Sequence, residues 1–215
     1  MDAAVWIMEL VLLILPAYFA NSIPVLLGGG APIDGGKKWN DGQRLFGDGK
    51  TVRGFFAGVL AGVAVGALEG VFLTGSGWDI YAIAGNGALA GGSGVFAGVM
   101  GVFTGSSAAV GNATAIAGLG AGAIYVLAGF LLGCGAMAGD LLGSFIKRRQ
   151  GLSRGKPSLV MDQLLFLALA LLFVYPLATR LLTLEAVLFL SVLTYFVHVS
   201  ANVIANRLGL KKVPW

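Results

Sequence analysis

Charged side chains are scarce in this chain. They make up only 11% of its 215 residues, against about a quarter in an ordinary soluble domain. Hydrophobic residues account for 57% of the chain, so the charges are too few to cover the surface of a soluble protein of this size. The composition therefore excludes a soluble globular enzyme and predicts one continuous bundle embedded in a membrane.

Cysteine is nearly absent too. The single residue, Cys134, excludes a disulfide framework and a cysteine-based zinc site, and its apolar surroundings predict a buried, unreactive thiol. The first residues carry no basic region of the kind that begins a cleavable signal peptide. The net charge of +4 comes without a soluble basic face, which excludes nucleic acid as a partner. We interpret the excess positive charge as a sign of membrane topology and anion binding.

Long apolar runs are what the sequence has in abundance. A membrane-spanning helix needs about 20 mostly apolar residues, and five windows satisfy this, at 5–27, 54–74, 119–145, 164–182 and 186–204. The predicted fold is an all-α polytopic transmembrane bundle of about five spans. The Gly- and Ala-rich segment 75–118 is poor helix material, and we expect it to lie on the outer side; two further spans there, seven in all, are the alternative.

Basic residues predict the orientation of these spans. All but one of the 14 Lys and Arg residues, Arg180, fall in three segments, 28–53, 146–160 and 207–215. The positive-inside rule places all three in the cytoplasm. The N-terminus is then outside and the C-terminus inside, which requires an odd number of spans.

Glycines recur every four residues in two windows, at positions 54 to 70 and 135 to 143. Such ridges of small residues allow neighbouring helix backbones to approach closely. We expect these ridges to be packing surfaces.

The end of the third window carries the strongest chemical signal. Asp140, Ser144 and Lys147 follow at helical spacing and share one stripe. Asp140 and Lys147 would lie about 10 Å apart along the axis, a separation that suits a metal-bound polyphosphate lying between them. An ionisable residue at membrane depth is costly, so the functional interpretation is favoured over simple anchoring.

A second carboxylate, Asp162, begins the fourth window shortly after Lys156. It enters the membrane from the side where Asp140 leaves it. Two carboxylates with only oxygen ligands in reach predict Mg²⁺, or Mn²⁺, rather than zinc. The alternative is that Asp162 caps the fourth helix, and both roles are compatible.

Two polar clusters precede the second window. A glycine-rich loop delivers Lys50, Thr51 and Arg53 to a helix N-terminus, which is a good seat for phosphate. It is not a Walker A loop, because Arg44 stands where that motif needs glycine. Asn21 and Ser22, near the end of the first window, either bind substrate or satisfy backbone groups freed by the proline that follows.

These motifs resemble those of the archaeal CDP-archaeol synthases, relatives of the bacterial CDP-diacylglycerol synthases. The resemblance covers most of the chain outside 75–118. It rests on Gly139-Asp140-Leu141, Ser144, Lys147-Arg148, Gly151 and Asp162, on Gly49-Lys50-Thr51-Val52-Arg53-Gly54, and on the runs Asp34-Gly35-Gly36-Lys37-Lys38 and Asp41-Gly42. The bacterial His-Gly-Gly element is missing, and Leu165-Phe166 stand where a second acidic residue would follow Asp162.

The resemblance implies a single integral membrane cytidylyltransferase domain over 1–215. It would transfer CMP from CTP to an unsaturated diether glycerol phosphate, releasing pyrophosphate, on the cytoplasmic face of a multi-pass cell-membrane protein. Its implied oligomeric state is open, a homodimer being one option. The implied metal ligands are Asp140 and Asp162; the implied catalytic cations are Lys50, Arg53, Lys147 and Lys156; the implied substrate-binding residues are Asn21, Ser22, Lys37, Asp41, Thr51, Ser144 and Arg148.

Two other functions compete with this one. A CDP-alcohol phosphotransferase would need Asp-Gly-x-x-Ala-Arg, a pattern that Asp41-Gly42-Gln43-Arg44 breaks. A small transporter or channel would place polar residues at several depths, whereas here they gather at one face.

Overall fold

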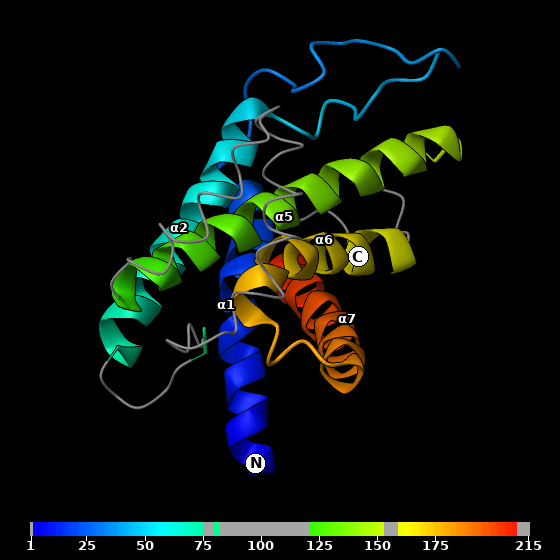
Figure 1. Cartoon of the computed structure of the whole chain (residues 1–215). Helices are drawn as coiled ribbons and strands as arrows, with labels where there is room; N and C mark the ends of the chain where they lie inside the picture. The colour runs from blue at the N-terminus through cyan, green and yellow to red at the C-terminus, as the bar shows by residue number, and fades with distance from the viewer. Residues whose placement is uncertain (1, 75–79, 82–120, 153–158, 210–215) are drawn as a thin grey trace, which may run out of the picture.

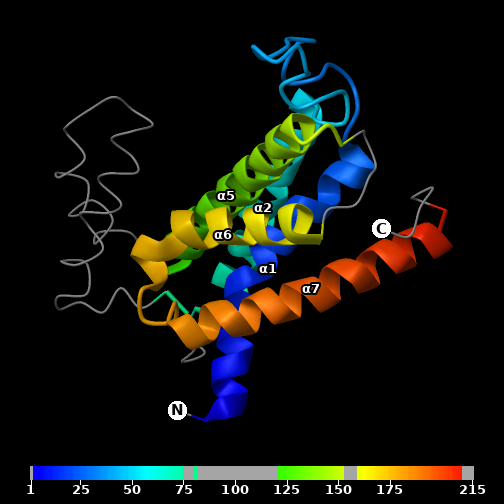
Figure 2. The same cartoon turned by 90° about the vertical axis from the view of Figure 1, so that its right-hand side faces the viewer.

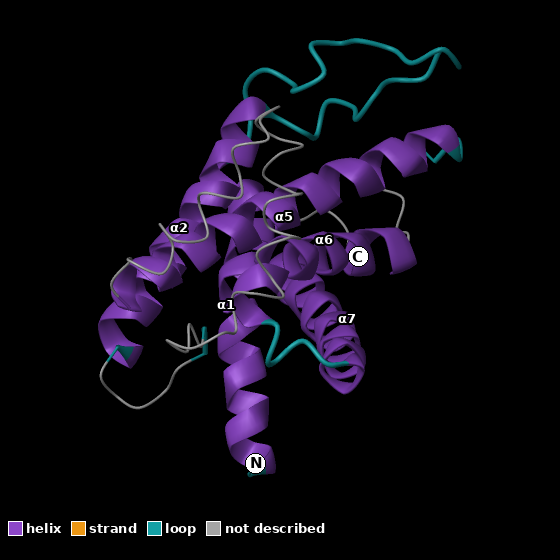
Figure 3. Ribbon diagram, in the orientation of Figure 1, coloured by secondary structure: helices purple, strands orange, loops and turns teal. Residues whose placement is uncertain are grey.

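The structure, a computed structural model, describes residues 2–74, 80–81, 121–152 and 159–209. It consists of five helices in this part of the chain: α1 (Ala3–Leu27), α2 (Val52–Leu73), α5 (Ala121–Arg149), α6 (Leu159–Ala178) and α7 (Leu184–Arg207). No strand forms among these residues (Figure 3). The predicted all-α polytopic bundle is confirmed. The predicted outer-side segment 75–118 falls almost entirely outside the described residues.

Four of these helices are long and apolar enough to cross a membrane: α1, α2, α5 from Gly122 onwards, and α7. The remaining helix, α6, is 20 residues long, about the length that the hydrocarbon core requires. Each helix matches one predicted window. α1 continues three residues past Pro24, although the proline lacks the N–H of a regular helical residue.

Helix α5 is the centre of the bundle. It packs along α2 on one side and along α6 on the other, and it also contacts α1 (Figure 1). Leu10, Leu13 and Ile14 of α1, Leu132 of α5 and Phe166 of α6 are fully buried and belong to one core cluster. Helix α7 lies along the edge and contacts the rest only lightly (Figure 2).

The glycine ridges bring these backbones together, as predicted. A Cβ at Gly62 of α2 would lie 2.6 Å from the carbonyl oxygen of Gly129 of α5, and a Cβ at Gly135 would lie 2.5 Å from the carbonyl oxygen of Leu169 of α6. Both separations are too short for a side chain. The two ridges therefore fix α5 between α2 and α6, with its C-terminal end beneath the loop that joins α1 to α2 (Figure 1).

Candidate active site

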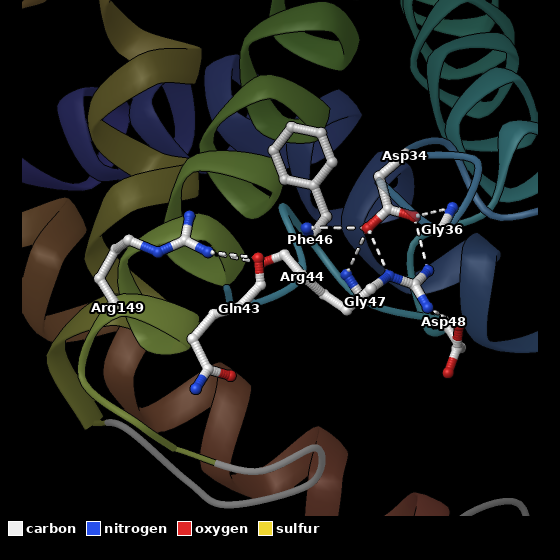
Figure 4. Close-up of polar contacts among 8 residues, drawn as sticks. All are labelled: Asp34, Gly36, Gln43, Arg44, Phe46, Gly47, Asp48 and Arg149. Atoms are coloured by element: carbon white, nitrogen blue, oxygen red, sulfur yellow. Dashed lines mark hydrogen bonds and ion pairs between the residues drawn. The ribbon is translucent and has the colours of Figure 1, made fainter. Parts of the chain in front are cut away.

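The loop between α1 and α2, residues 28–51, folds around one buried carboxylate, Asp34 (Figure 4). Its side chain has no exposed surface. Arg44 donates to it through Nη2 at 2.6 Å and through Nε at 3.3 Å. Three backbone N–H groups also donate to it, those of Gly36, Phe46 and Gly47, at 3.1, 3.1 and 3.0 Å.

The Arg44 guanidinium is the main reason that the pKa of Asp34 lies well below its usual range, although burial opposes the shift. Asp34 is therefore a permanent anion at neutral pH. Since one carboxylate connects residues 36, 44, 46 and 47, it gives a glycine-rich loop a defined shape.

Arg149, the last residue of α5, attaches this loop to the bundle. Its Nη2 donates to the carbonyl oxygens of Arg44 at 2.6 Å and Gln43 at 3.3 Å (Figure 4). Its Nε lies 2.6 Å from the Asp41 carboxylate. Asp41, expected to bind substrate, is thus an ion-pair partner of Arg149 in this structure.

Aromatic packing supports the same contact. The Arg149 guanidinium carbon lies 4.4 Å from the centre of the Phe145 ring, and the Trp39 ring meets Phe145 edge-on at 5.5 Å. A cation over an aromatic face and a T-shaped ring pair each stabilise the contact by about 0.5–1.5 kcal/mol. The loop is therefore held against the last turn of α5 from two sides.

The loop ends by bringing Lys50 to Asp140. The Lys50 ammonium donates to the Asp140 carboxylate at 2.5 Å, across 90 residues of sequence. Both side chains are about a third exposed, at 27% and 32%, so a ligand can reach them. The sequence analysis assigned Lys50 and Asp140 to the same site, and the structure brings their side chains into contact.

Thr51 closes the loop at the start of α2. Its hydroxyl accepts from the N–H of Gly54 at 3.1 Å, as an N-cap, and from the N–H of Gly29 at 3.2 Å. The two ends of the loop therefore meet at the N-terminus of α2, where the helix dipole favours an anion. Arg53, in the first turn of α2, is exposed.

The last turns of α5 carry the other predicted groups. Ser144 is buried, and Lys147 and Arg148 are half-buried. The Nε of Arg148 is buried and has no hydrogen-bond partner in the described part of the chain. It lies beneath Gly47 of the loop, 3.9 Å from where a Cβ would stand. A buried guanidinium N–H that lacks an acceptor suits an anionic ligand.

Not every predicted residue joins this centre. Lys37 is exposed on the loop, and on α1 Asn21 is half-buried and Ser22 exposed. Lys156 lies outside the described residues. Asp162 belongs to the first turn of α6, and its side chain is likewise outside the description.

The donors at this centre fit a hard divalent cation. Asp140 offers a carboxylate that is about a third exposed, and the buried Ser144 carries a hydroxyl one turn further along the same helix. No group of three His, Cys, Asp or Glu residues gathers within the described ranges. Mg²⁺ needs no such cage, because it binds through one or two carboxylates together with phosphate oxygens.

Sequence reasoning missed three residues that build the site: Asp34 as the centre of the loop, Arg44 as its partner, and Arg149 as the attachment to α5. Within the basic triplet 147–149, the sequence analysis assigned roles to Lys147 and Arg148 but none to Arg149. The only sequence signal for Arg149 is its spacing, two and a half helical turns after Asp140. In the structure this is where loop 28–51 contacts α5.

Known proteins resemble this chain along its whole length. The family model described as "CarS-like: CDP-archaeol synthase" matches residues 4–89 and 79–215. The CDP-archaeol synthase of Pyrococcus abyssi is 45% identical over 94% of both chains. That of Archaeoglobus fulgidus is 39% identical over 97% of this chain and 98% of its own. A solved structure described as an intramembrane enzyme for archaeal membrane lipid biosynthesis is 30% identical, covers 89% of this chain and 91% of its own, and superposes with a TM-score of 0.54.

Proposed function

This chain belongs to the CDP-archaeol synthase family and forms CDP-archaeol from CTP in archaeal lipid biosynthesis, and we propose that it does so where loop 28–51 meets the end of α5. The family assignment selects a cytidylyltransferase over the phosphotransferase and the transporter considered above. The contact between Lys50 and Asp140 carries the proposal for the site. It joins an ammonium group of the loop, which can bind phosphate, to a carboxylate of α5, which can bind a metal ion.

The reaction requires two anions to meet. A phosphate oxygen of the lipid attacks the α-phosphorus of CTP, a new P–O bond forms, and the bond from the α-phosphorus to the bridging oxygen breaks. Pyrophosphate leaves with the electron pair. No strong general base is needed, because a phosphate monoester is already ionised at neutral pH. The protein's main task is to neutralise and position the two phosphate groups.

Cations from both elements are available for this task. Lys50 comes from the loop, and Lys147 and Arg148 come from the last turns of α5. We assign Lys50, Lys147 and Lys156 to the transferring phosphates, together with Arg53 in the first turn of α2. Lys50 exchanges its carboxylate partner for a phosphate oxygen when CTP binds, since its ammonium is accessible.

The remaining predicted residues are assigned to nucleotide and substrate binding. Thr51 and Ser144 contribute hydroxyl groups next to the charged centre. We assign Asn21 and Ser22 of α1, and Lys37 and Asp41 of the loop, to substrate binding as well. Asp41 takes this role only when Arg149 releases it, because the two are paired in this structure.

A divalent cation, Mg²⁺ or alternatively Mn²⁺, fits this centre. Asp140 and Asp162 would hold it, and bound there it would supply positive charge to the phosphates of CTP. The oxygen donors of α5 support this assignment. Asp140 would become free to hold the cation once Lys50 exchanges it for a phosphate oxygen.

We place the centre on the cytoplasmic face, with the N-terminus outside and the C-terminus inside. Support comes from the bias of Lys and Arg towards three segments. It also comes from the contacts of Arg149 with Gln43 and Arg44, which join the first two of these segments at one end of the bundle.

A transfer assay tests the proposal. Detergent-purified protein receives CTP labelled in the cytosine ring, Mg²⁺ and a phosphorylated unsaturated diether lipid. We expect lipid-soluble label with wild-type protein, and a loss of at least 100-fold in Asp140→Asn. The matched control is Glu185→Gln, an exposed carboxylate in the first turn of α7, which should behave like wild type. Wild-type rates in Asp140→Asn would refute the assignment of the centre.

A further inference from the structure

Glu69 is a buried acid that the active centre does not use. It lies near the end of α2, about 27 Å along the helix from Thr51, since eighteen residues rise by 1.5 Å each. We call this end of the bundle, opposite loop 28–51, the far end. Glu69 is 5% exposed. Both of its carboxyl oxygens are buried, and neither has a hydrogen-bond partner in the part of the chain that the structure describes.

The residues on either side of Glu69 bring α2 into close contact with the start of α5 (Figure 1). A Cβ at Gly70 would lie 2.9 Å from the carbonyl oxygen of Gly122, and a Cβ at Gly66 would collide with the carbonyl oxygen of Tyr125. The two backbones therefore touch at the level of Glu69. Because its carboxyl oxygens are themselves buried, water reaches them only if α2 separates from its neighbours.

A second buried polar group, the hydroxyl of Tyr81, lies in the same region. Tyr81 is 4% exposed, its ring meets the Tyr125 ring at 5.0 Å, and its hydroxyl has no hydrogen-bond partner within the described ranges. Burial raises the pKa of Tyr81 well above its usual range, and the charges of Glu69 and Tyr125 add to this rise. Tyr81 therefore remains a neutral phenol and does not neutralise Glu69.

The charged side chains of the far end pair with each other instead. Helix α2 packs on α5 and on α1. From α5 the titratable group at this level is Tyr125, whose hydroxyl lies 3.5 Å from the N–H of Ile80. From α1 it is Glu9, which accepts from Nη2 of Arg180 at 3.0 Å. Among the described residues, no basic side chain forms an ion pair with Glu69.

An ionised carboxylate in this position is costly, because neither a cation nor a set of N–H groups replaces the water that it has lost. One carboxylate beside a phenol offers fewer oxygens than a hard metal ion takes. A proton needs no coordination shell and removes the charge, which is the usual response of a buried acid. The surroundings of Glu69 therefore suit a proton better than a metal ion.

We propose that Glu69 is a proton-binding site that keeps the far ends of α2 and α5 together. It is a neutral acid in the folded protein, and loss of its proton loosens this contact, because the carboxylate must then be hydrated. The site is separate from the centre around Lys50 and Asp140, and it makes the stability of the bundle depend on pH.

Infrared difference spectroscopy at neutral pH detects the proton directly. A neutral carboxylic acid and a carboxylate absorb in different bands, and subtracting the spectrum of Glu69→Gln from that of wild type isolates this one group. We expect Glu69→Gln to lose intensity in the neutral-acid band. The matched control is Glu9→Gln, which removes the other buried carboxylate of the far end. Since Glu9 is paired with Arg180, this variant should lose intensity in the carboxylate band instead.

Thermal melts at several pH values measure the consequence for stability. The folded protein keeps a proton that the unfolded chain releases above the ordinary glutamate pKa of about 4.3, so a rise in pH favours unfolding. Relative to Glu69→Gln, the unfolding equilibrium constant of wild type should increase by up to about tenfold per pH unit between about pH 6 and pH 8. The wild-type Tm should therefore fall more steeply with pH. Glu185→Gln, at an exposed position of α7, should follow wild type.

Two results would overturn the proposal. Loss of the carboxylate band in Glu69→Gln would show that Glu69 is ionised and has a cation bound to it. The same pH dependence of Tm in wild type and Glu69→Gln would show that no proton is taken up there on folding. If Glu69→Gln does not fold, Glu69→Leu gives the same subtraction with an apolar side chain. Both measurements are made without CTP or lipid, so their outcome is independent of the proposed function.

Discussion

Replacing Asp34 by asparagine should detach the loop from the active centre without unfolding the bundle. The change keeps the size of the side chain but removes the charge that Arg44 and three N–H groups bind. Removing one partner of a buried ion pair costs about 3–5 kcal/mol. We expect the lower end, because Arg44 keeps a second carboxylate, Asp48, at 2.8 Å.

A loss of about 3 kcal/mol changes the balance between docked and undocked loop about 100-fold. The amides of Phe46 and Gly47, which donate to Asp34, should exchange hydrogen about 100-fold faster. The rate of cytidylyl transfer should fall, because Lys50 is no longer held at Asp140, whereas the Tm of the helical bundle should change little.

The matched control is Asp48→Asn, which removes the other, mostly exposed partner of Arg44. At 68% exposure it should have little effect on exchange or activity. Equal amide exchange in wild type and Asp34→Asn, or equal effects of the two substitutions, would refute the role of Asp34.

The same carboxylate gives a prediction for pH. The pKa of Asp34 is lowered in the folded loop, so its stabilisation is present above the ordinary carboxyl pKa of about 3.9 and is lost only as pH falls through the folded value. Protection of the Phe46 amide, corrected for intrinsic exchange, should therefore be constant from about pH 8 to pH 5. A decline within this window would contradict the assignment.

Two remaining predictions concern the centre and the packing beneath it. Lys50→Met and Asp140→Asn should each lower kcat/KM for CTP about 100-fold. The double variant should have nearly the same kcat/KM as either single variant, because the two residues act as a unit. Fully additive losses of kcat/KM would show that they act separately. Gly62→Ala should destabilise the protein by about 1–3 kcal/mol, since the new methyl group meets the carbonyl of Gly129. Gly122→Ala, where a Cβ meets nothing within 4 Å, should be neutral in thermal melts, and equal Tm losses in the two would exclude this cause.

The helices could be predicted from sequence because a membrane restricts the options. Apolar windows of about 20 residues have one stable conformation in hydrocarbon, and glycine at every fourth position indicates a close contact. What the pattern leaves open is the partner. The ridge through Gly62 matches glycines in α5, while Gly135 faces α6 through a leucine carbonyl.

The loop could not be predicted in the same way. Asp34 stands between a proline-isoleucine pair and two glycines, a context typical of an exposed turn. Its burial depends on Arg44, ten residues later, and on the N–H groups of Phe46 and Gly47. Such long-range pairing in a glycine-rich segment has no periodic signal, whereas Lys50 and Asp140 were identifiable by their chemistry.

The orientation of the active centre is open to a direct measurement. In a Cys134→Ala background, single cysteines replace Lys38 in the loop and Gln150 at the end of α5, both exposed. A membrane-impermeant maleimide is applied to intact cells and to everted vesicles. The account predicts that both positions are labelled in everted vesicles and that neither is labelled in intact cells. Labelling of either position from outside the cell would contradict a cytoplasmic site built from these two segments.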